Sequence, residues 1–483
     1  MKNMTGKWLR VTALLCFLQG AETGRALELV STDGVGLQIP AGAHSPSVSE
    51  DGRYVAFVTS EAISPWDLNG VEDVYLKDRV TGTIRLVSAR LSTDGDGPSH
   101  SPVISADASA VAFASEATNF VTGLAGSDTN GVQDVFVARL TLGGDLVRVS
   151  VDASGNEGNN FSQLPSISAD GTLVAFESLA SNLVAGDGNG EFDVFAVTVG
   201  DPGSIQRVSV SGSGMEGNGM STKASVSPDG NFVGFASSAT NLVAEDTGGI
   251  TSIFLRDLGQ GSTSVVSLDQ NGGPPNGLSF LCSVSRDGLF VAFQSSAGDL
   301  VADDTNLKQD VFVHDVILGT TSRVSVGALG AEGDQDAKFV PGGISDDGNL
   351  VVFSTKSNLG GSVGAGISNV YVHDRRRART TCLSEAPGRQ PANGDSIQPV
   401  LSAGGKFVVF RSSADNLVAE DGNGSQADIF LTLANPYDPR PALLRKLKKL
   451  KKQLKAAKKA DQAAKVKRLG QQMKRVRAQL RRL

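Results

Sequence analysis

Cysteine, histidine and aromatic residues are scarce in this sequence. It contains three cysteines and four histidines among 483 residues, and three cysteines are too few for a disulfide-built scaffold. Aromatic residues make up 6% of the chain, and no apolar run is long enough to span a lipid bilayer. Glycine is abundant, with 57 residues, and this composition is typical of a chain with many tight turns.

The formal net charge of −7 is the sum of two regions of opposite sign. From Arg440 onward the sequence contains 18 basic residues and one acidic residue, Asp461, which gives +17. The preceding 439 residues hold the other 26 basic and 50 acidic residues, which gives −24. The acidic region before Arg440 attracts cationic partners, and the basic region from Arg440 onward attracts anionic partners.

The N-terminal residues have the pattern of an export signal. Three basic residues precede an apolar run at residues 11–18, which is too short to span a bilayer but has the length of a signal h-region. The small residues Gly24 and Ala26 permit cleavage before Leu27, and Ala21 marks an earlier alternative. We therefore expect residues 1–26 to be a signal peptide and the protein to be exported, either to a periplasm or to the cell surface.

Seven repeats, spaced 56 to 63 residues apart, fill most of the remaining sequence. Each repeat has an Asp-Gly-type turn followed by a Val-x-Phe strand, and a second aromatic residue follows 18 to 23 positions later. The first aromatic positions are Phe57, Phe113, Phe176, Phe235, Phe293, Phe353 and Phe410, and the second are Tyr75, Phe136, Phe195, Phe254, Phe312, Tyr371 and Phe430.

Each repeat divides into four short strands separated by glycine, asparagine or aspartate. One such sheet cannot bury its apolar faces, whereas a ring of them can. The last repeat ends after its third strand, at residue 433, and residues 27–31 match an unpaired fourth strand. We therefore predict an all-β fold, a seven-bladed β-propeller over residues 27–433 whose N-terminal strand completes the last blade. A linear solenoid is the alternative, but it leaves that strand unpaired.

Three motifs resemble those of the TolB-like propeller repeat family. They are Ser-Ala-Asp-Gly at residues 168–171, Val-Ala-Phe at 174–176 and Val-His-Asp at 313–315. The resemblance spans residues 27–433 and implies a propeller, usually with a protein-binding or scaffold role in the bacterial envelope. It does not define one activity. The repeats here are longer and carry an additional loop motif, so the role in the Tol system is not transferred.

The additional motif, Asp-x-Asn, lies in the loop between the second and third strands, and a further aspartate follows at the seventh or eighth position. Closely spaced carboxylate and amide oxygens can bind calcium, which takes six to eight oxygen ligands. Calcium is therefore a candidate cofactor. The candidate ligands are Asp67, Asn69 and Asp73; Asp128, Asn130 and Asp134; Asp187, Asn189 and Asp193; Asp304, Asn306 and Asp310; and Asp421, Asn423 and Asp428.

The alternative interpretation of this motif is a tight loop without metal, because aspartate, asparagine and glycine also cap turns. The motif differs from a helix-loop-helix calcium loop, since position five is Val71, Val132 or Glu191 and position twelve is not glutamate. The fourth repeat keeps only Asp246, and the sixth keeps neither residue. If calcium binds, we expect it to have a structural role.

Candidate catalytic residues are few. His44 and His100 occupy matching positions near the mouth of the central channel, but Gln163 and Thr222 stand there in the next two repeats, so no third histidine completes a metal site. His314 and His373 have equivalent strand positions, and we expect them at the surface. The sequence contains no Gly-x-Ser-x-Gly motif. Paired carboxylates for polysaccharide cleavage remain an alternative, because a sequence does not give their separation.

The two cysteines that follow the signal peptide are expected to be free and buried. Cys282 lies on a predicted innermost strand and Cys382 on an outermost strand of the next repeat, too far apart for a disulfide.

The sequence after the repeats predicts a proline-rich linker at residues 434–442 and a basic α-helix at residues 443–483. Apolar residues form two seams with alternating three and four spacing, and the shift of two residues between them predicts a stutter or bend near Ala463. The seams are Leu447, Leu450, Leu454 and Ala457, then Val466, Leu469, Met473, Val476, Leu480 and Leu483.

This helix has three interpretations: a solvated helix, a coiled coil that makes a homo-oligomer, or an arm that binds an anionic phospholipid surface, an envelope polymer or an acidic protein. Nucleic acid matches the charge but is not expected for an exported chain, and we expect no transmembrane span in the mature chain.

Three functional hypotheses follow. The first is an exported, non-catalytic propeller that binds a protein or envelope polymer on its acidic loops. The second is a polysaccharide hydrolase or lyase that uses carboxylates at the channel mouth. The third is a calcium-stabilised adhesion or surface module. A channel lined by serine and valine favours the first hypothesis, and a deep pocket lined by carboxylates favours the second.

Overall fold

The computed structural model describes residues 27–90, 93–121, 128–140, 145–245, 247–419, 421–435, 448–452 and 471–474. The predicted signal peptide, Asp246 and most of the linker and basic tail lie outside these residues. The chain consists of two compact units, which meet between Ala434 and Asn435 in the sequence.

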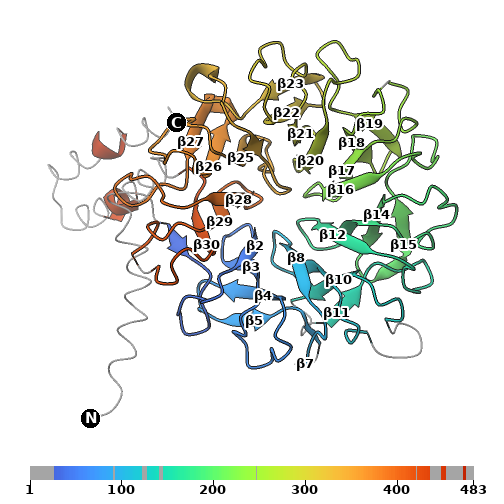
Figure 1. Cartoon of the computed structure of the whole chain (residues 1–483), viewed down its shortest axis with the longest axis horizontal. Helices are drawn as coiled ribbons and strands as arrows, with labels where there is room; N and C mark the ends of the chain where they lie inside the picture. Colours follow the sequence, from blue (N-terminus) through green and yellow to red (C-terminus); the bar gives the residue numbers. More distant parts are fainter. Residues whose placement is uncertain are drawn as a thin grey trace. The chain divides into compact units, whose positions relative to one another are not determined.

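The first unit is a ring of seven four-stranded antiparallel sheets (Figure 1), so the predicted seven-bladed β-propeller is confirmed. From the innermost strand outward, the blades are β2 (His44–Val48), β3 (Tyr54–Thr59), β4 (Asp73–Asp78) and β5 (Ile84–Leu86); β8 (Ser99–Ile104), β9 (Ala110–Ser115), β10 (Asp134–Arg139) and β11 (Asp145–Arg148); β12 (Ser162–Ile167), β13 (Leu173–Ser178), β14 (Asp193–Thr198) and β15 (Asp201–Arg207).

The next three blades are β16 (Ser221–Val226), β17 (Phe232–Ser237), β18 (Ser252–Asp257) and β19 (Ser262–Val265); β20 (Ser279–Val284), β21 (Phe290–Ser295), β22 (Asp310–Asp315) and β23 (Thr320–Arg323); β24 (Ala337–Lys338), β25 (Leu350–Thr355), β26 (Asn369–Asp374) and β27 (Arg379–Cys382). The seventh is β28 (Ser396–Leu401), β29 (Phe407–Ser412), β30 (Asp428–Leu433) and β1 (Glu28–Leu29). Smaller elements are β6 (Ala89–Arg90), β7 (Thr93–Asp94) and the 3-10 turns η2 (Ala328–Gly330) and η3 (Arg375–Arg377).

The N-terminal strand closes the ring, as predicted. Strand β1 pairs with β30, with Leu29 opposite Phe430, and Figure 1 shows the two strands together although they lie at opposite ends of the repeats. The Ser31 hydroxyl donates to Asp428 at 2.6 Å, and Arg79 of the first blade forms an ion pair with Glu28. Because the strand pairing and the Ser31–Asp428 hydrogen bond join residues about 400 positions apart, the ring closes only when both ends of the repeats are in place.

The fourteen repeated aromatic residues form the core of the blades. In each blade the aromatic residue of the second strand faces that of the third, with ring centroids 5.6–6.3 Å apart and planes within 28° of parallel. All fourteen side chains are buried. A buried aromatic side chain stabilises a fold through a large buried area and through stacking worth about 0.5–1.5 kcal/mol per pair. The aromatic spacing in the sequence therefore sets the position of each blade.

The loops divide between two faces of the ring. The loop face comprises the loops joining second to third strands (β3–β4, β9–β10, β13–β14, β17–β18, β21–β22, β25–β26 and β29–β30) and those leading to the next blade (β1–β2, β5–β8, β11–β12, β15–β16, β19–β20, β23–β24 and β27–β28). The turn face comprises the remaining turns, which include the Asp-Gly turns. The Asp-x-Asn motifs consequently all lie on the loop face.

The described part of the second unit is helical at residues 448–452 and 471–474, where Leu450 and Met473 are buried. Leu450 belongs to the first predicted apolar seam and Met473 to the second. The rest of the helix predicted for residues 443–483 stays a prediction. No helix among the described residues is both long and apolar enough to cross a membrane. Cys282 and Cys382 are free and buried, as expected.

Candidate functional site

The aspartate at the seventh or eighth position of each loop motif begins the third strand of its blade and is completely buried. Its Oδ1 accepts the hydroxyl hydrogen of a serine beside or just beyond the fourth strand, at 2.5–2.6 Å, and the same serine oxygen accepts a backbone N–H from the third strand. This contact joins the two outer strands. The aspartate and serine partners are Asp73 and Ser88, Asp134 and Ser150, Asp193 and Ser209, Asp310 and Ser325, and Asp428 and Ser31.

The asparagine of the motif uses both ends of its amide within the chain. In four blades its Oδ1 accepts the backbone N–H two residues later, at 2.7–2.9 Å, which is an Asx turn. In all five blades its Nδ2 donates to a backbone carbonyl of the loop that leads to the next blade, at 2.7–3.1 Å. The asparagine therefore tightens its own loop and joins it to a neighbouring one.

The first aspartate of the motif contributes to a cluster of three carboxylates in the second, third and fifth blades. Each cluster adds a glutamate from the loop leading to the next blade and a buried arginine from the end of the fourth strand. The arginine side chains are only 3–6% exposed. The clusters are Asp128, Asp134, Glu157 and Arg148; Asp187, Asp193, Glu216 and Arg207; and Asp304, Asp310, Glu332 and Arg323.

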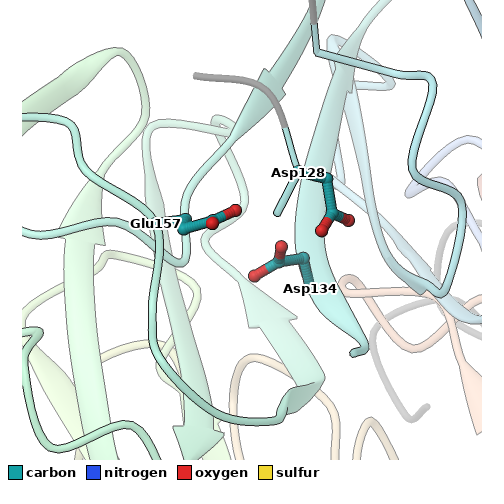
Figure 2. A group of neighbouring side chains, drawn as sticks. All are labelled: Asp128, Asp134 and Glu157. Carbon is teal, nitrogen blue, oxygen red and sulfur yellow. The ribbon is translucent and has the colours of Figure 1, made fainter. Parts of the chain in front are cut away.

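Figure 2 shows the cluster of the second blade, in which the carboxyl groups of Asp128, Asp134 and Glu157 point toward one another. One oxygen of each lies within 4.8 Å of the others. Arg148 lies 3.2 Å from Asp134 and 3.0 Å from Glu157. The guanidinium therefore supplies the positive charge that three adjacent carboxylates need.

The first and seventh blades contain the two aspartates but no arginine, because Leu86 and Leu29 occupy its position. In each of these two blades a different side chain donates hydrogen bonds to the aspartates. In the first blade the Tyr75 hydroxyl donates to Asp67. In the seventh blade Gln38 takes the place of the glutamate, and its amide donates at 2.8 Å to Asp421 and to Asp428.

In the sixth blade Asn369 replaces the buried aspartate and Cys382 lies at the arginine position, so that blade has no carboxylate pair to neutralise. Among the described loops, every pair of motif aspartates thus has a nearby arginine, tyrosine or glutamine as its donor.

Burial raises the pKa of the buried carboxyls in these clusters. The pKa of Asp73, Asp134, Asp193 and Asp304 rises to about 6, mainly through desolvation. Glu332 differs, since hydrogen bonds from Thr305 lower its pKa to about 2. In the second and fifth blades the cluster therefore combines a glutamate whose pKa is lowered, Glu157 or Glu332, with an aspartate whose pKa is raised to about 6.

The geometry tests whether the motif residues fit calcium. The amide oxygens are used in Asx turns in four blades, and one oxygen of each buried aspartate is bound to serine. An arginine lies beside the aspartates in three of the five blades that carry the motif. Only a few carboxylate oxygens, such as Asp67 Oδ1, Asp128 Oδ2 and Asp304 Oδ2, are buried without a hydrogen-bond partner. This donor set fits a guanidinium better than an ion that takes six to eight oxygens. We therefore favour the alternative of a loop without metal, and calcium binding is untested.

The arginines and glutamates were missed by the sequence analysis because they lie outside the motif. Arg148 follows Asp134 by fourteen residues and Glu157 follows it by twenty-three, so only the strand pairing brings them together. Aligning the repeats by their aromatic residues would have revealed them, because arginine opposes the third-strand aromatic in the three repeats that have all three acids.

The histidines do not form a shared site. His44 contacts Glu72 at 3.0 Å, and His100 contacts the amide of Gln133, so each ring has its own partner. The expectation that His373 lies at the surface is wrong. It is only 6% exposed and burial lowers its pKa to about 4, because strand β26 is buried along its whole length.

The central channel contains a cavity of about 350 Å³ lined mainly by serine, proline and branched aliphatic side chains. Among its lining residues, Asp346 and Lys223 are the charged ones. Asp346 accepts a hydrogen bond from Arg286 at 2.8 Å. A lone, arginine-bound carboxylate does not provide the pair of acids that glycoside hydrolysis requires.

Comparisons with known proteins find likenesses in structure only. No family model and no curated protein sequence matches the chain. A structure of TolB from Agrobacterium tumefaciens aligns with a TM-score of 0.35 and 14% identity over 60% of this chain and 94% of that one. A puromycin hydrolase mutant aligns with a TM-score of 0.43 and 13% identity over 79% and 52% of the two chains.

A third structure, dipeptidyl peptidase 4 from Porphyromonas gingivalis, aligns with a TM-score of 0.44 and 14% identity over 92% of this chain and 63% of that one. A TolB structure is thus among the similar ones. Likeness at this level says nothing about the activity or ligand of this chain.

Proposed function

We propose that this protein is an exported, non-catalytic propeller that binds another protein through its loop face. One observation carries this proposal. Of the fourteen large apolar side chains that are exposed among the described residues, ten lie on the loop face. They are Val35, Leu37, Trp66, Leu68, Phe161, Met215, Met220, Leu278, Leu307 and Leu329.

An exposed leucine on its own needs no explanation, but apolar side chains gathered on one face are typical of an interaction surface. Leu68 is 84% exposed and Leu307 is 93% exposed, and both stand in loops that carry the Asp-x-Asn motif. The hydrogen bonds of those motifs hold the loops in one arrangement before a partner binds. A rigid scaffold that presents apolar loop residues reduces the ordering cost of association.

The charge of the propeller favours a basic partner. The 439 residues that precede Arg440 carry a net charge of −24, which steers cationic surfaces toward the protein. The basic segment from Arg440 onward would then tether the protein to an anionic surface or join two copies. The alternative of a polysaccharide-cleaving enzyme has no comparable support, since the channel is lined mainly by serine, proline and aliphatic residues.

The proposal is tested by capture on the full-length protein. Immobilised protein is incubated with an envelope extract from the organism that encodes it, and retained proteins are quantified by mass spectrometry. The test variant carries Trp66→Ser, Leu68→Ser, Leu307→Ser and Leu329→Ser on the loop face. The matched control carries Val80→Ser, Ile317→Ser and Leu318→Ser, which are exposed to a similar degree on the turn face.

We expect a specific partner that the wild type and the turn-face control retain and that the loop-face variant loses. All three proteins should melt alike, because the substituted side chains are exposed. Equal retention by both variants would exclude the loop face as the binding surface. Retention of a polysaccharide instead of a protein would support an envelope polymer as the ligand. Export is tested separately by sequencing the N-terminus of the secreted protein, which should begin at Leu27.

A further inference from the structure

The cavity of the central channel is distinct from the loop face. It extends from the Asp-Gly turns of the turn face, where Ala106, Ala169 and Ala403 line it, to the middle of the innermost strands. Every blade contributes one or two valine, isoleucine or leucine side chains to the lining, such as Val226 and Ile344, which are only 6% exposed. The cavity is therefore a shaft with aliphatic walls.

The inner end of the shaft is built from strained backbone. In six blades the innermost strand has a non-glycine residue in the left-handed region, with φ between 50° and 58°, and all six residues line the cavity. Left-handed backbone costs about 1–2 kcal/mol at a residue other than glycine. These residues lie where each innermost strand shifts register against the second strand, and such a bulge turns a side chain toward a new direction. The six residues are Ser45, Ser101, Leu164, Lys223, Leu281 and Gln398.

This inner end is polar and carries one positive charge. Lys223 is the basic residue that lines the cavity, and no salt bridge to it occurs among the residues that the structure describes. The amide oxygen of Gln398 is buried and has no hydrogen-bond partner. The carboxylate of Asp346 at the outer end already faces Arg286. The buried carboxylate of Glu177 already accepts the backbone N–H of Lys223 at 2.6 Å and a side-chain N–H of Gln163 at 2.8 Å. The ammonium of Lys223 is thus the charge left for a ligand.

We propose that the channel binds an aliphatic carboxylate, with its hydrocarbon chain in the shaft and its carboxylate at Lys223. The volume lies within the range of small-ligand sites, which combine apolar walls with a few polar groups that fix orientation. A carboxylate at Lys223 would receive a charge-assisted hydrogen bond in a site with little water. This site goes beyond the proposed function and does not depend on it, because the cavity lies away from the loop face.

The proposal is tested by calorimetric titration of the full-length protein with octanoate, decanoate and dodecanoate, each below its micelle concentration. Each methylene that enters the shaft should lower Kd about fourfold, which corresponds to about 0.8 kcal/mol. Decanol and decylammonium, which share the chain length, should bind more weakly than decanoate. Tighter binding of the ammonium compound, or the same Kd for all three carboxylates, would overturn the proposal.

Lys223→Met provides the second test, and the exposed Lys356→Met is its matched control. The Lys223 variant should bind decanoate roughly tenfold to a hundredfold more weakly, the effect of losing a hydrogen bond to a charged group, while its affinity for decanol should not fall. The control should match the wild type. A Lys223 variant that melts like the wild type and binds decanoate equally well would refute the role of this lysine.

Discussion

The buried arginines permit a quantitative prediction about the stability of the loop face. Arg148 is 3% exposed, and its partners Asp134 and Glu157 are 0% and 17% exposed. Removing one partner of a buried ion pair typically costs about 3–5 kcal/mol, because a charge is left buried without compensation. We therefore expect Arg148→Leu to lower the free energy of unfolding by about 3–5 kcal/mol, measured by denaturant titration.

The exposed arginine of the turn face is the matched control. Arg286 contacts Asp346 but is 45% exposed, and an exposed ion pair contributes about 0–1 kcal/mol. Arg286→Leu should therefore change stability by less than about 1 kcal/mol. If Arg148→Leu costs no more than this control does, the arginine does not hold the cluster together and the reasoning is wrong.

The seventh blade suggests how the loss can be reversed. There leucine stands at the arginine position and Gln38 donates to both aspartates while its own oxygen accepts a backbone N–H at 2.7 Å. Glu157→Gln added to Arg148→Leu copies this arrangement into the second blade. The double variant should be more stable than Arg148→Leu alone, and a double variant that is less stable would contradict the proposed exchange of donors.

Two further predictions follow from burial. Because the pKa of Asp73, Asp134 and Asp193 is raised to about 6, these carboxyls bind more protons in the folded state than in the unfolded chain between about pH 4 and pH 6. The melting temperature should therefore be higher at about pH 5 than at about pH 7.5, and Asp193→Asn should reduce the difference. A melting temperature that rises toward pH 7.5 would oppose this. Burial also raises the pKa of Cys282 to about 12, so a thiol reagent should label this residue only after unfolding; rapid labelling of native protein would contradict its burial.

The aromatic repeats made the fold predictable from the sequence. An aromatic pair equivalent to Phe57 and Tyr75 is present in every one of the seven repeats. In each blade the two residues of the pair lie opposite each other on neighbouring strands. The closing strand was predictable as well, because residues 27–31 had the pattern of a fourth strand without three strands before it.

The candidate site was predictable only in part, since its contacts depend on strand pairing. The loop motif identified Asp128 and Asp134, but Arg148 reaches them only because β11 runs back along β10. His373 was expected at the surface as a repeat-derived equivalent of His314. Strand β26 is instead buried along its whole length, and a position within a repeat does not by itself indicate this burial.

The account rests on the claim that the chain's own donors, and not a metal ion, hold the loop face together. Calorimetric titration of calcium into chelator-treated full-length protein, with melting curves before and after chelation, tests this claim most directly. The account predicts no tight calcium site and the same melting temperature with and without chelator. Several tight sites, together with a lower melting temperature after chelation, would contradict it and support a calcium-stabilised module instead.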